Sequence, residues 1–146
     1  MNLTQYGLDR SIIFGLRERM GEEFRVDLLY DGYEFPDDRP LITVENMQSN
    51  YEPVSKLREG IQAIYRYQIG LHDVNSVELS KNKEVIANLF NFHRFKYFEE
   101  SPDNIKGFFY CELTAVVPMP ASDISKQSEF HRVYFDVEIE NIKRRC

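Results

Sequence analysis

The strongest constraint on the fold comes from residues 129–142, where apolar and polar side chains alternate almost without interruption. Phe135 and Val137 fall on one side of an extended strand, whereas Asp136 and Glu138 fall on the other. A period of two is typical of a half-buried strand, because successive side chains point to opposite faces of a sheet. The pattern predicts an antiparallel sheet with one face on a core and the other toward water.

Further stretches along the chain have strand character, either by alternation or by a short run of β-branched residues. The five predicted strands are 24–30, 41–47, 61–71, 107–117 and 129–142. In the fourth strand, the residues expected on the buried side are Phe109, Cys111, Leu113, Ala115 and Val117. The fourth and fifth strands are expected to pair. Two polar stretches, Gln48–Glu59 and Pro118–Ser128, are expected to be long loops, and each contains proline.

Two segments have apolar residues at helical spacing, residues 9–20 and 76–92. Asp9 is the expected N-cap of the first helix, and Gly21 follows its last turn. Either Asp73 or Asn75 can cap the second helix. The apolar stripe expected on the second helix consists of Val77, Val85, Ile86, Leu89 and Phe90.

These elements predict an α+β fold, a mostly antiparallel sheet of about five strands packed against two helices. A length of 146 residues suits a single domain, which we expect to span residues 1–146. No stretch approaches the roughly 18 consecutive apolar residues that cross a bilayer. The first residues lack the pattern of a secretory signal, so we expect a soluble protein made in the cytoplasm. Cys111 and Cys146 are expected to be free thiols.

Residue types that carry chemistry are scattered. His72, His93 and His131 lie far apart, and no two histidines have the spacing of a zinc-binding helix. The seven glycines form no phosphate-binding loop, and no Gly-x-Ser-x-Gly motif is present. We therefore expect no catalytic residue, no metal and no cofactor. The net charge of −6 also argues against a general duplex-binding surface.

Three features remain as candidates for a functional surface. The first is the row Asp136, Glu138 and Glu140 on one face of the last predicted strand. Such a row is most often a solvated face, although carboxylates can also bind a hard cation. The row is followed by a basic end that includes Arg144.

The second candidate is the segment 91–98, in which basic residues interleave with Phe92, Phe95 and Tyr97. Its aromatic side chains can close the core below the second helix, contact another subunit or stack on single-stranded bases.

The third candidate is the loop after the fourth strand. Its apolar and proline residues suit contact with a partner chain. An equal alternative is that the loop folds back on the hairpin that it connects and contacts no partner. The loop residues taken as candidate contacts are Pro118, Met119, Pro120 and Ile124.

The order of these elements resembles the tail terminator, or tail-completion, proteins of long-tailed bacteriophages. The resemblance covers nearly the whole chain. It rests on the chain length, on the Tyr-rich strand AIYRYQIGLHD leading directly into a helix, and on the closing strand FDVEIEN with its basic end. None of these is a diagnostic motif.

The resemblance implies a structural virion protein without enzymatic activity. Proteins of that family form a ring, typically a hexamer, which ends growth of the tail tube and joins the tail to the DNA-filled head. The implied partners are further copies of the chain, the tail tube protein and a head-closure protein, with no membrane. The implied location is the virion tail, assembled in the host cytoplasm. DNA would pass through the channel without specific binding, and the row Asp136, Glu138 and Glu140 is the candidate lining because acidic groups repel phosphates.

Three alternatives stay open. The chain can be another head-tail connector or a baseplate component, since such proteins share its size and composition. It can be an adaptor that binds single-stranded nucleic acid through segment 91–98. A small hydrolase or transferase that uses scattered acids is the third, and the sequence assembles no nucleophile, base or metal cluster for it.

Overall fold

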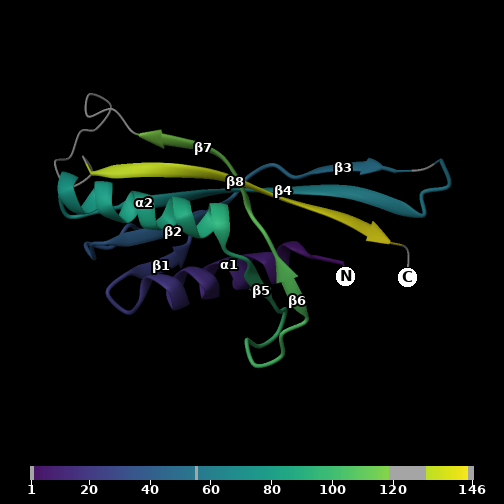
Figure 1. Ribbon diagram of the computed structural model, residues 1–146, viewed down its shortest axis with the longest axis horizontal. Coiled ribbons are helices and arrows are strands. Elements are labelled where there is room, and N and C mark those ends of the chain that lie inside the picture. The colour runs from purple at the N-terminus through teal and green to yellow at the C-terminus, as the bar shows by residue number, and fades with distance from the viewer. Residues whose placement is uncertain (1, 55, 119–130, 145–146) are drawn as a thin grey trace.

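The computed structural model describes residues 2–54, 56–118 and 131–144 (Figure 1). Two helices and eight strands follow one another along these residues. In chain order they are α1 (Gln5–Met20), β1 (Arg25–Leu28), β2 (Leu41–Asn46), β3 (Asn50–Pro53), β4 (Gly60–His72), α2 (Ser76–Phe92), β5 (Phe95–Tyr97), β6 (Gly107–Phe109), β7 (Glu112–Pro118) and β8 (Arg132–Arg144). The α+β class predicted from the sequence is confirmed.

The main sheet has six strands, close to the five expected, in the order β1-β2-β4-β8-β7. The sixth strand, β3, pairs with β4 on the same side as β2, which makes β2 and β3 two successive segments beside one long strand. All pairs are antiparallel except β1 with β2. A separate two-stranded sheet is formed by β5 and β6.

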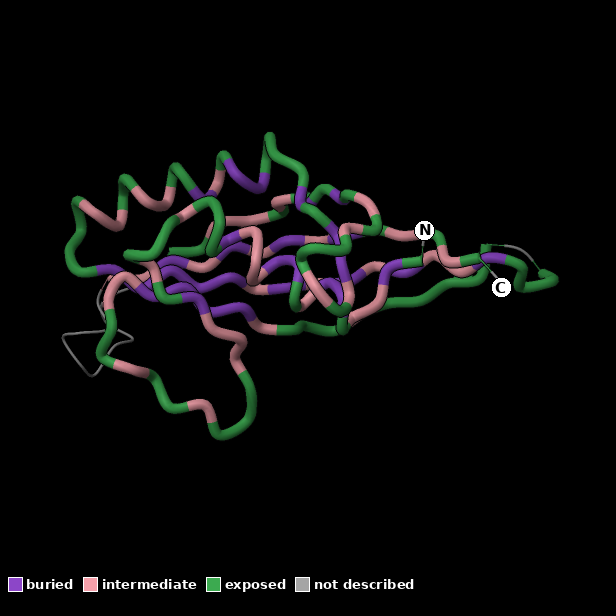
Figure 2. The backbone as a smooth tube through the Cα atoms, turned by 90° about the horizontal axis from the view of Figure 1, so that it is seen from below, coloured by how far each residue is buried: buried purple, intermediate pink, exposed green. Residues whose placement is uncertain are grey.

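Both helices pack against the same face of the main sheet. Tyr67 of β4 donates a hydrogen bond from its hydroxyl to Asp9 of α1, and Phe135 of β8 packs against Phe90 of α2. Tyr67 and Phe135 point to one face because Ile69, two residues along β4, is the register partner of Phe135. The opposite face, called the open face below, is covered by neither helix of the described residues. The loop of residues 29–40 projects on that side (Figure 2).

The alternation in the two longest strands was predicted correctly. In β4 the residues Tyr65, Tyr67, Ile69 and Leu71 are buried, and in β8 the residues Val133, Phe135, Val137 and Ile139 are buried. These side chains form the centre of the core, together with apolar residues of both helices. Burial of this kind is the main favourable term in folding, at about 25 cal/mol per Å² of apolar surface.

Helix α1 begins four residues earlier than the sequence pattern indicates. Its N-cap is Thr4, whose side-chain oxygen accepts a hydrogen bond from the Gly7 amide at 3.1 Å. Asp9 therefore lies inside the helix, where its carboxylate accepts the hydroxyl of Tyr67 at 2.6 Å. The expectation of an Asp9 cap is therefore wrong. Thr and Asp side chains can both accept from the free amides of a first helical turn, so residue type alone does not identify the cap. Their tertiary contacts distinguish the two residues: Asp9 accepts from Tyr67 and Asn46, whereas Thr4 bonds Tyr97 and Glu99.

The second helix spans the predicted residues and is capped by Asn75, which accepts from the Glu78 amide at 2.8 Å. Asp73 instead accepts from the Val74 amide and from the side chain of Asn82. The apolar stripe is narrower than predicted. Ile86, Leu89 and Phe90 are buried as expected, whereas Val77 and Val85 are exposed.

The single strand predicted over 107–117 is broken into β6 and β7. β6 pairs with β5, and β7 turns away to pair with β8, as expected for the fourth and fifth predicted strands. A register shift between Leu113 and Ala115 changes which residues face the core. Val116 packs against the core, and Val117 is exposed, contrary to the simple alternation.

Helix α1 lies unusually close to β5, and two glycines make this possible. A side-chain carbon added at Gly7 would overlap the ring of Tyr97, and one added at Gly15 would overlap the ring of Phe95. Both aromatic residues belong to β5 and are buried. The absent side chains let the two rings lie directly against the helix backbone.

Candidate assembly surface and the open sheet face

The main sheet extends well beyond both helices at one end. We call this extension the arm and define it as β3, residues 60–66 of β4 and residues 138–144 of β8. The register runs without a break to the pair Gly60 and Arg144 at its tip. The arm forms the thin end of the molecule in Figures 1 and 2, and the first and last described residues, Asn2 and Arg144, meet there.

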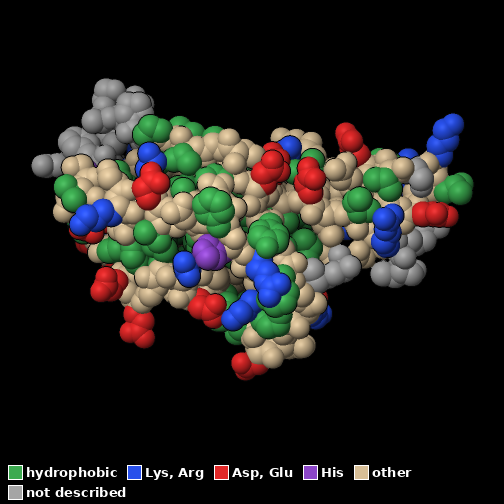
Figure 3. Space-filling model, viewed as in Figure 1, with side chains coloured by type: hydrophobic (Ala, Val, Ile, Leu, Met, Phe, Trp, Pro, Cys, Tyr) green, Lys and Arg blue, Asp and Glu red, His purple; other side chains and the backbone are tan. Residues whose placement is uncertain are grey.

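Apolar side chains on and beside the arm remain in contact with water. Tyr51 is 55% exposed, Leu57 74% and Ile142 46%. In the view of Figure 3, apolar atoms reach the surface along the arm among charged side chains. A ribbon of two or three strands has no core of its own and gains stability only from packing on something else. Exposed apolar side chains on such a ribbon are typical of an interaction surface.

The N-terminal segment lies along the outer edge of β8 in the arm. The side-chain amide of Asn2 donates to the carbonyl of Arg144, and its side-chain oxygen accepts from the Arg144 amide at 3.0 Å. The amide of Leu3 donates to the side chain of Asn141. This edge is on the side away from β4, and β7 pairs with β8 only as far as Glu138.

The predicted acidic row lies on the open face. Asp136 accepts a hydrogen bond from Gln68, and Glu138 forms an ion pair with Arg66 at 3.0 Å. Glu140 is exposed. The sheet register also brings Glu45 of β2 and Glu112 of β7 to this face. Glu45 stands beside Gln68, and Glu112 beside Glu138.

The middle of the open face is thus more acidic than one strand indicates. The carboxylates gathered by the register are Glu45, Glu112, Asp136, Glu138 and Glu140. Among the described residues, one of them, Glu138, forms an ion pair, with Arg66. The sequence analysis missed Glu45 and Glu112 because their positions depend on strand pairing and not on spacing within one strand.

The other end of the open face is basic and partly covered by loop 29–40. His72 is buried there, with the ring of Phe35 at 5.5 Å and the ring of Tyr134 at 6.1 Å. Burial, reinforced by the nearby guanidinium groups of Arg39 and Arg132, lowers the pKa of His72 to about 4. His72 is therefore neutral at neutral pH.

The aromatic segment 91–98 is mainly core. Phe95 and Tyr97 are buried against α1, with Phe95 stacked between Phe90 and Phe109 at centroid distances of 5.7 and 5.5 Å. The expectation that Phe95 and Tyr97 contact a partner does not fit this fold, and neither ring is available for stacking on bases. The first of the three alternatives for this segment, closure of the core, describes both residues.

Other predicted contact residues have exposed positions. Phe92, at the end of α2, is 73% exposed, and Pro118 and Arg144 are exposed at the ends of β7 and β8. Met119, Pro120 and Ile124 lie outside the described residues. Contact of any of these with a partner stays a prediction.

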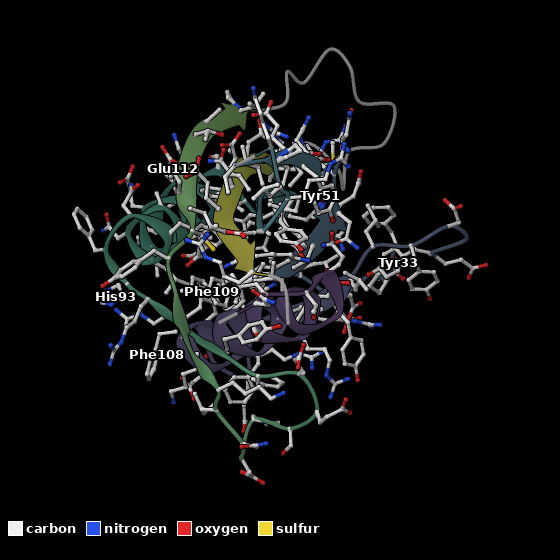
Figure 4. The ribbon with its side chains drawn as sticks, turned by 90° about the vertical axis from the view of Figure 1, so that its right-hand side faces the viewer. Tyr33, Tyr51, His93, Phe108, Phe109 and Glu112 are labelled. Atoms are coloured by element: carbon white, nitrogen blue, oxygen red, sulfur yellow. The ribbon has the colours of Figure 1, made fainter. Side chains whose placement is uncertain are left out.

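A groove of about 650 Å³ lies between α1 and the start of loop 29–40. Tyr33, labelled in Figure 4, is one of its lining residues. The hydroxyl of Tyr33 donates to Asp27 at 2.7 Å. Burial and this carboxylate raise the pKa of Tyr33 to about 12. Arg25 also pairs with Asp27. These groups satisfy one another, and the arrangement contains no nucleophile held by a base.

The described part of the chain contains no group of three or more His, Cys, Asp or Glu side chains placed to hold a metal ion. Neither of its helices is long and apolar enough to cross a membrane. Comparison with known proteins adds no relative, since no family model and no curated protein matches the chain.

Proposed function

We propose that this chain is a structural subunit of a bacteriophage virion that assembles into a ring, with six copies as the expected number. In this proposal the ring caps the head-proximal end of the tail tube, ends its growth and joins the tail to the head. The support comes from the order of elements, which resembles tail terminator proteins, and from the shape of the subunit. No chemical step is involved.

The arm is the single observation that carries the proposal. A ring needs a heterologous interface, in which one patch on a subunit meets a different patch on the next. The arm and the turn between β3 and β4 offer exposed apolar side chains, Ile142 on β8 and Leu57 in the turn, at a distance from the helix-covered core. An extension of this shape can pack on a neighbouring subunit without disturbing the core of the subunit to which it belongs.

The acidic middle of the open face is the proposed channel lining. Its five carboxylates would keep DNA phosphates from sticking to the wall. Glu138 is partly neutralised by Arg66, so Asp136 and Glu140 of the original row, with Glu112, carry more of the expected repulsion.

The test of assembly is mass measurement and negative-stain microscopy of the purified chain over a concentration series. The chain is compared with an arm variant, Leu57→Ser with Ile142→Ser, and with a control, Val77→Ser with Val85→Ser. All four positions are exposed, and the control pair lies on α2, outside the arm.

We expect rings from the wild type and the control, and monomers from the arm variant with an unchanged unfolding transition. Rings that form equally well from the arm variant would remove the arm from the interface. A wild-type chain that forms rings only on added tail tubes would favour a terminator that needs its template. A chain that joins neither itself nor tail tubes would favour a different connector or a baseplate component.

The channel lining has its own test. Reversal of the row to Lys at Asp136, Glu138 and Glu140 is expected to impair DNA ejection and infectivity while rings still form. Reversal of three exposed carboxylates outside the row, Glu22, Glu23 and Glu84, serves as the charge-matched control. Unchanged infectivity after reversal of the row would exclude it as the lining.

A further inference from the structure

Three buried side-chain nitrogen atoms lack a hydrogen-bond partner in the described chain, and they meet at one corner of the open face. They are Arg39 Nε, His72 Nε2 and Arg132 Nε. His72 and Arg132 are register partners on β4 and β8, and Arg39 precedes β2, whose Leu41 is the register partner of His72. Buried donors without an acceptor are rare in folded proteins, and each costs about 1–3 kcal/mol.

The corner also lacks a counter-charge. Among the described residues, no carboxylate forms an ion pair with Arg39 or Arg132. Two acidic residues are direct neighbours of these groups along the chain. Asp38, beside Arg39, pairs with Arg25, and Asp73, beside His72, uses its two oxygens to accept from Val74 and Asn82. Arg39 donates from one of its two terminal nitrogens, Nη1, to the backbone carbonyls of Pro36 and Asp38. Two permanent positive charges therefore lie near a neutral imidazole, and neither of them pairs with a carboxylate of the described residues.

The geometry holds the imidazole in place and directs it inward. His72 is 3% exposed, and the rings of Phe35 and Tyr134 flank it. Its Nε2 lies over Gly70, 3.2 Å from the point where a side-chain carbon would be and beside the hydroxyl of Thr43. Gly70 has no side chain, and the hydroxyl of Thr43, the ring of Tyr134 and the imidazole of His72 pack over it instead. Loop 29–40, which carries both Phe35 and Arg39, forms the outer wall.

We propose that this corner is an oxyanion site, in which a phosphate or carboxylate group accepts hydrogen bonds from Arg39, His72 and Arg132. Guanidinium groups pair with both classes of oxyanion, and charge-assisted bonds are the stronger kind. Burial of all three nitrogens favours a small head group over a large ligand. The site does not depend on the proposed ring, because its residues all come from one chain and lie at the end of the sheet away from the arm.

The first test compares thermal unfolding in potassium phosphate and in potassium chloride of the same ionic strength at pH 7.5. Phosphate is expected to raise the Tm of the wild type by about 3 °C at saturating concentration. Arg39→Gln and Arg132→Gln are expected to abolish the rise. Arg94→Gln is the control, because Arg94 is an exposed cation that stacks on Phe108 at 3.8 Å, away from the corner.

The same variants separate an anion site from a structural role. In chloride alone, Arg132→Gln is expected to unfold at the same temperature as the wild type or higher, because it removes a positive charge that pairs with no described carboxylate and contacts the ring of Tyr134 only at 5.9 Å. A structural arginine would give the opposite sign. A lower Tm in chloride together with an unchanged response to phosphate would overturn the proposal.

The second test identifies the source of the anion by NMR of the imidazole nitrogens. In dilute protein, phosphate and acetate are expected to shift the resonances of His72 saturably and to leave those of His93 and His131 unmoved. A shift that develops with protein concentration alone, and is lost in Arg132→Gln, would assign the acceptor to a carboxylate of a second copy. Resonances of His72 that respond to neither anion nor to protein concentration would refute the site.

Discussion

Strands β4 and β8 run through two different surroundings, and the contrast between them separates what holds this subunit together from what it offers to others. In the body of the molecule, the paired residues Ile69 and Phe135 are fully buried beneath the helices. In the arm, the helix-facing side of the sheet continues to Tyr51 of β3, the register partner of Ala63, yet Tyr51 is 55% exposed. Ile142 lies on the opposite, open face and is 46% exposed. Side chains on the same side of the sheet are therefore fully buried beneath the helices and half exposed at the arm.

The largest expected effect is a loss of core packing in the body. Phe135→Ala is expected to lower the free energy of unfolding by about 3–5 kcal/mol, because it leaves a cavity beside Phe90. Ile142→Ala, a truncation on the open face of the arm, is expected to stay within about 0.5 kcal/mol. Urea unfolding followed by circular dichroism measures both. Equal losses would mean that the arm contributes to the stability of the isolated subunit.

A hydrogen bond that ties the sheet to α1 is expected to come next. Tyr67→Phe removes the hydroxyl that donates to Asp9 at 2.6 Å, and the expected loss is about 1–2 kcal/mol. Tyr51→Phe, on the arm, is the control and is expected to change little. The same pair can be followed by phenol absorbance. Burial and the Asp9 carboxylate raise the pKa of Tyr67, so its ring is expected to stay protonated until the protein unfolds.

The body end of β4 also predicts a dependence on pH. The pKa of His72 is lowered to about 4 by burial and by Arg39 and Arg132, against 6.5 in an unfolded chain. A group with a depressed pKa binds its proton more tightly when unfolded. Stability is therefore complete above pH 6.5 and falls as the pH drops toward 4.

Between pH 6.5 and 5.5 the loss at His72 is expected to be about 1 kcal/mol. His72→Gln is expected to flatten this part of the profile, and His93→Gln, at the end of α2, serves as the control. The readout is the Tm in chloride buffers across this interval. An unchanged slope in His72→Gln would show that other groups govern the pH dependence.

The smallest expected effect concerns the ion pair at the root of the arm. Arg66 and Glu138 have side chains that are 35% and 25% exposed. Such pairs contribute about 0.5 kcal/mol in double-mutant cycles, and salt weakens them. A cycle built on Arg66→Gln and Glu138→Gln measures the coupling at two salt concentrations. A coupling well above 1 kcal/mol would indicate that the pair is part of the core and not of the solvated face.

The sequence was most informative where local pattern and tertiary environment agree. Alternation predicted the buried sides of β4 and β8, and the Asn75 cap followed from side-chain chemistry alone. It was least informative where a decision depends on contact. Thr4 and Asp9 are equally good caps by residue type, and they differ in tertiary contacts such as that of Asp9 with Tyr67, which is 58 residues away. Val77 fits the helical period but finds no neighbour, so it is exposed.

The candidate surfaces divide in the same way. One strand predicted the row Asp136, Glu138 and Glu140, whereas Glu45 and Glu112 entered it only through pairing of neighbouring strands. No sequence pattern indicated the corner at Arg39, His72 and Arg132. Arg39 and Arg132 are 93 residues apart in the chain, and the three residues come together only in the sheet. The arm was also invisible, since a strand pattern does not show where the covering helices end.

The contact of Gly7 and Gly15 with the rings of Tyr97 and Phe95 has a consequence for the order of folding. Glycine weakens a helix by about 1 kcal/mol at each site, so α1 on its own is a poor helix. The surface that compensates it is translated some eighty residues later. The first helix of this protein is therefore expected to stay unformed on the ribosome until β5 has emerged. A chain truncated after α2 lacks β5, and its first helix is then expected to stay unfolded as well.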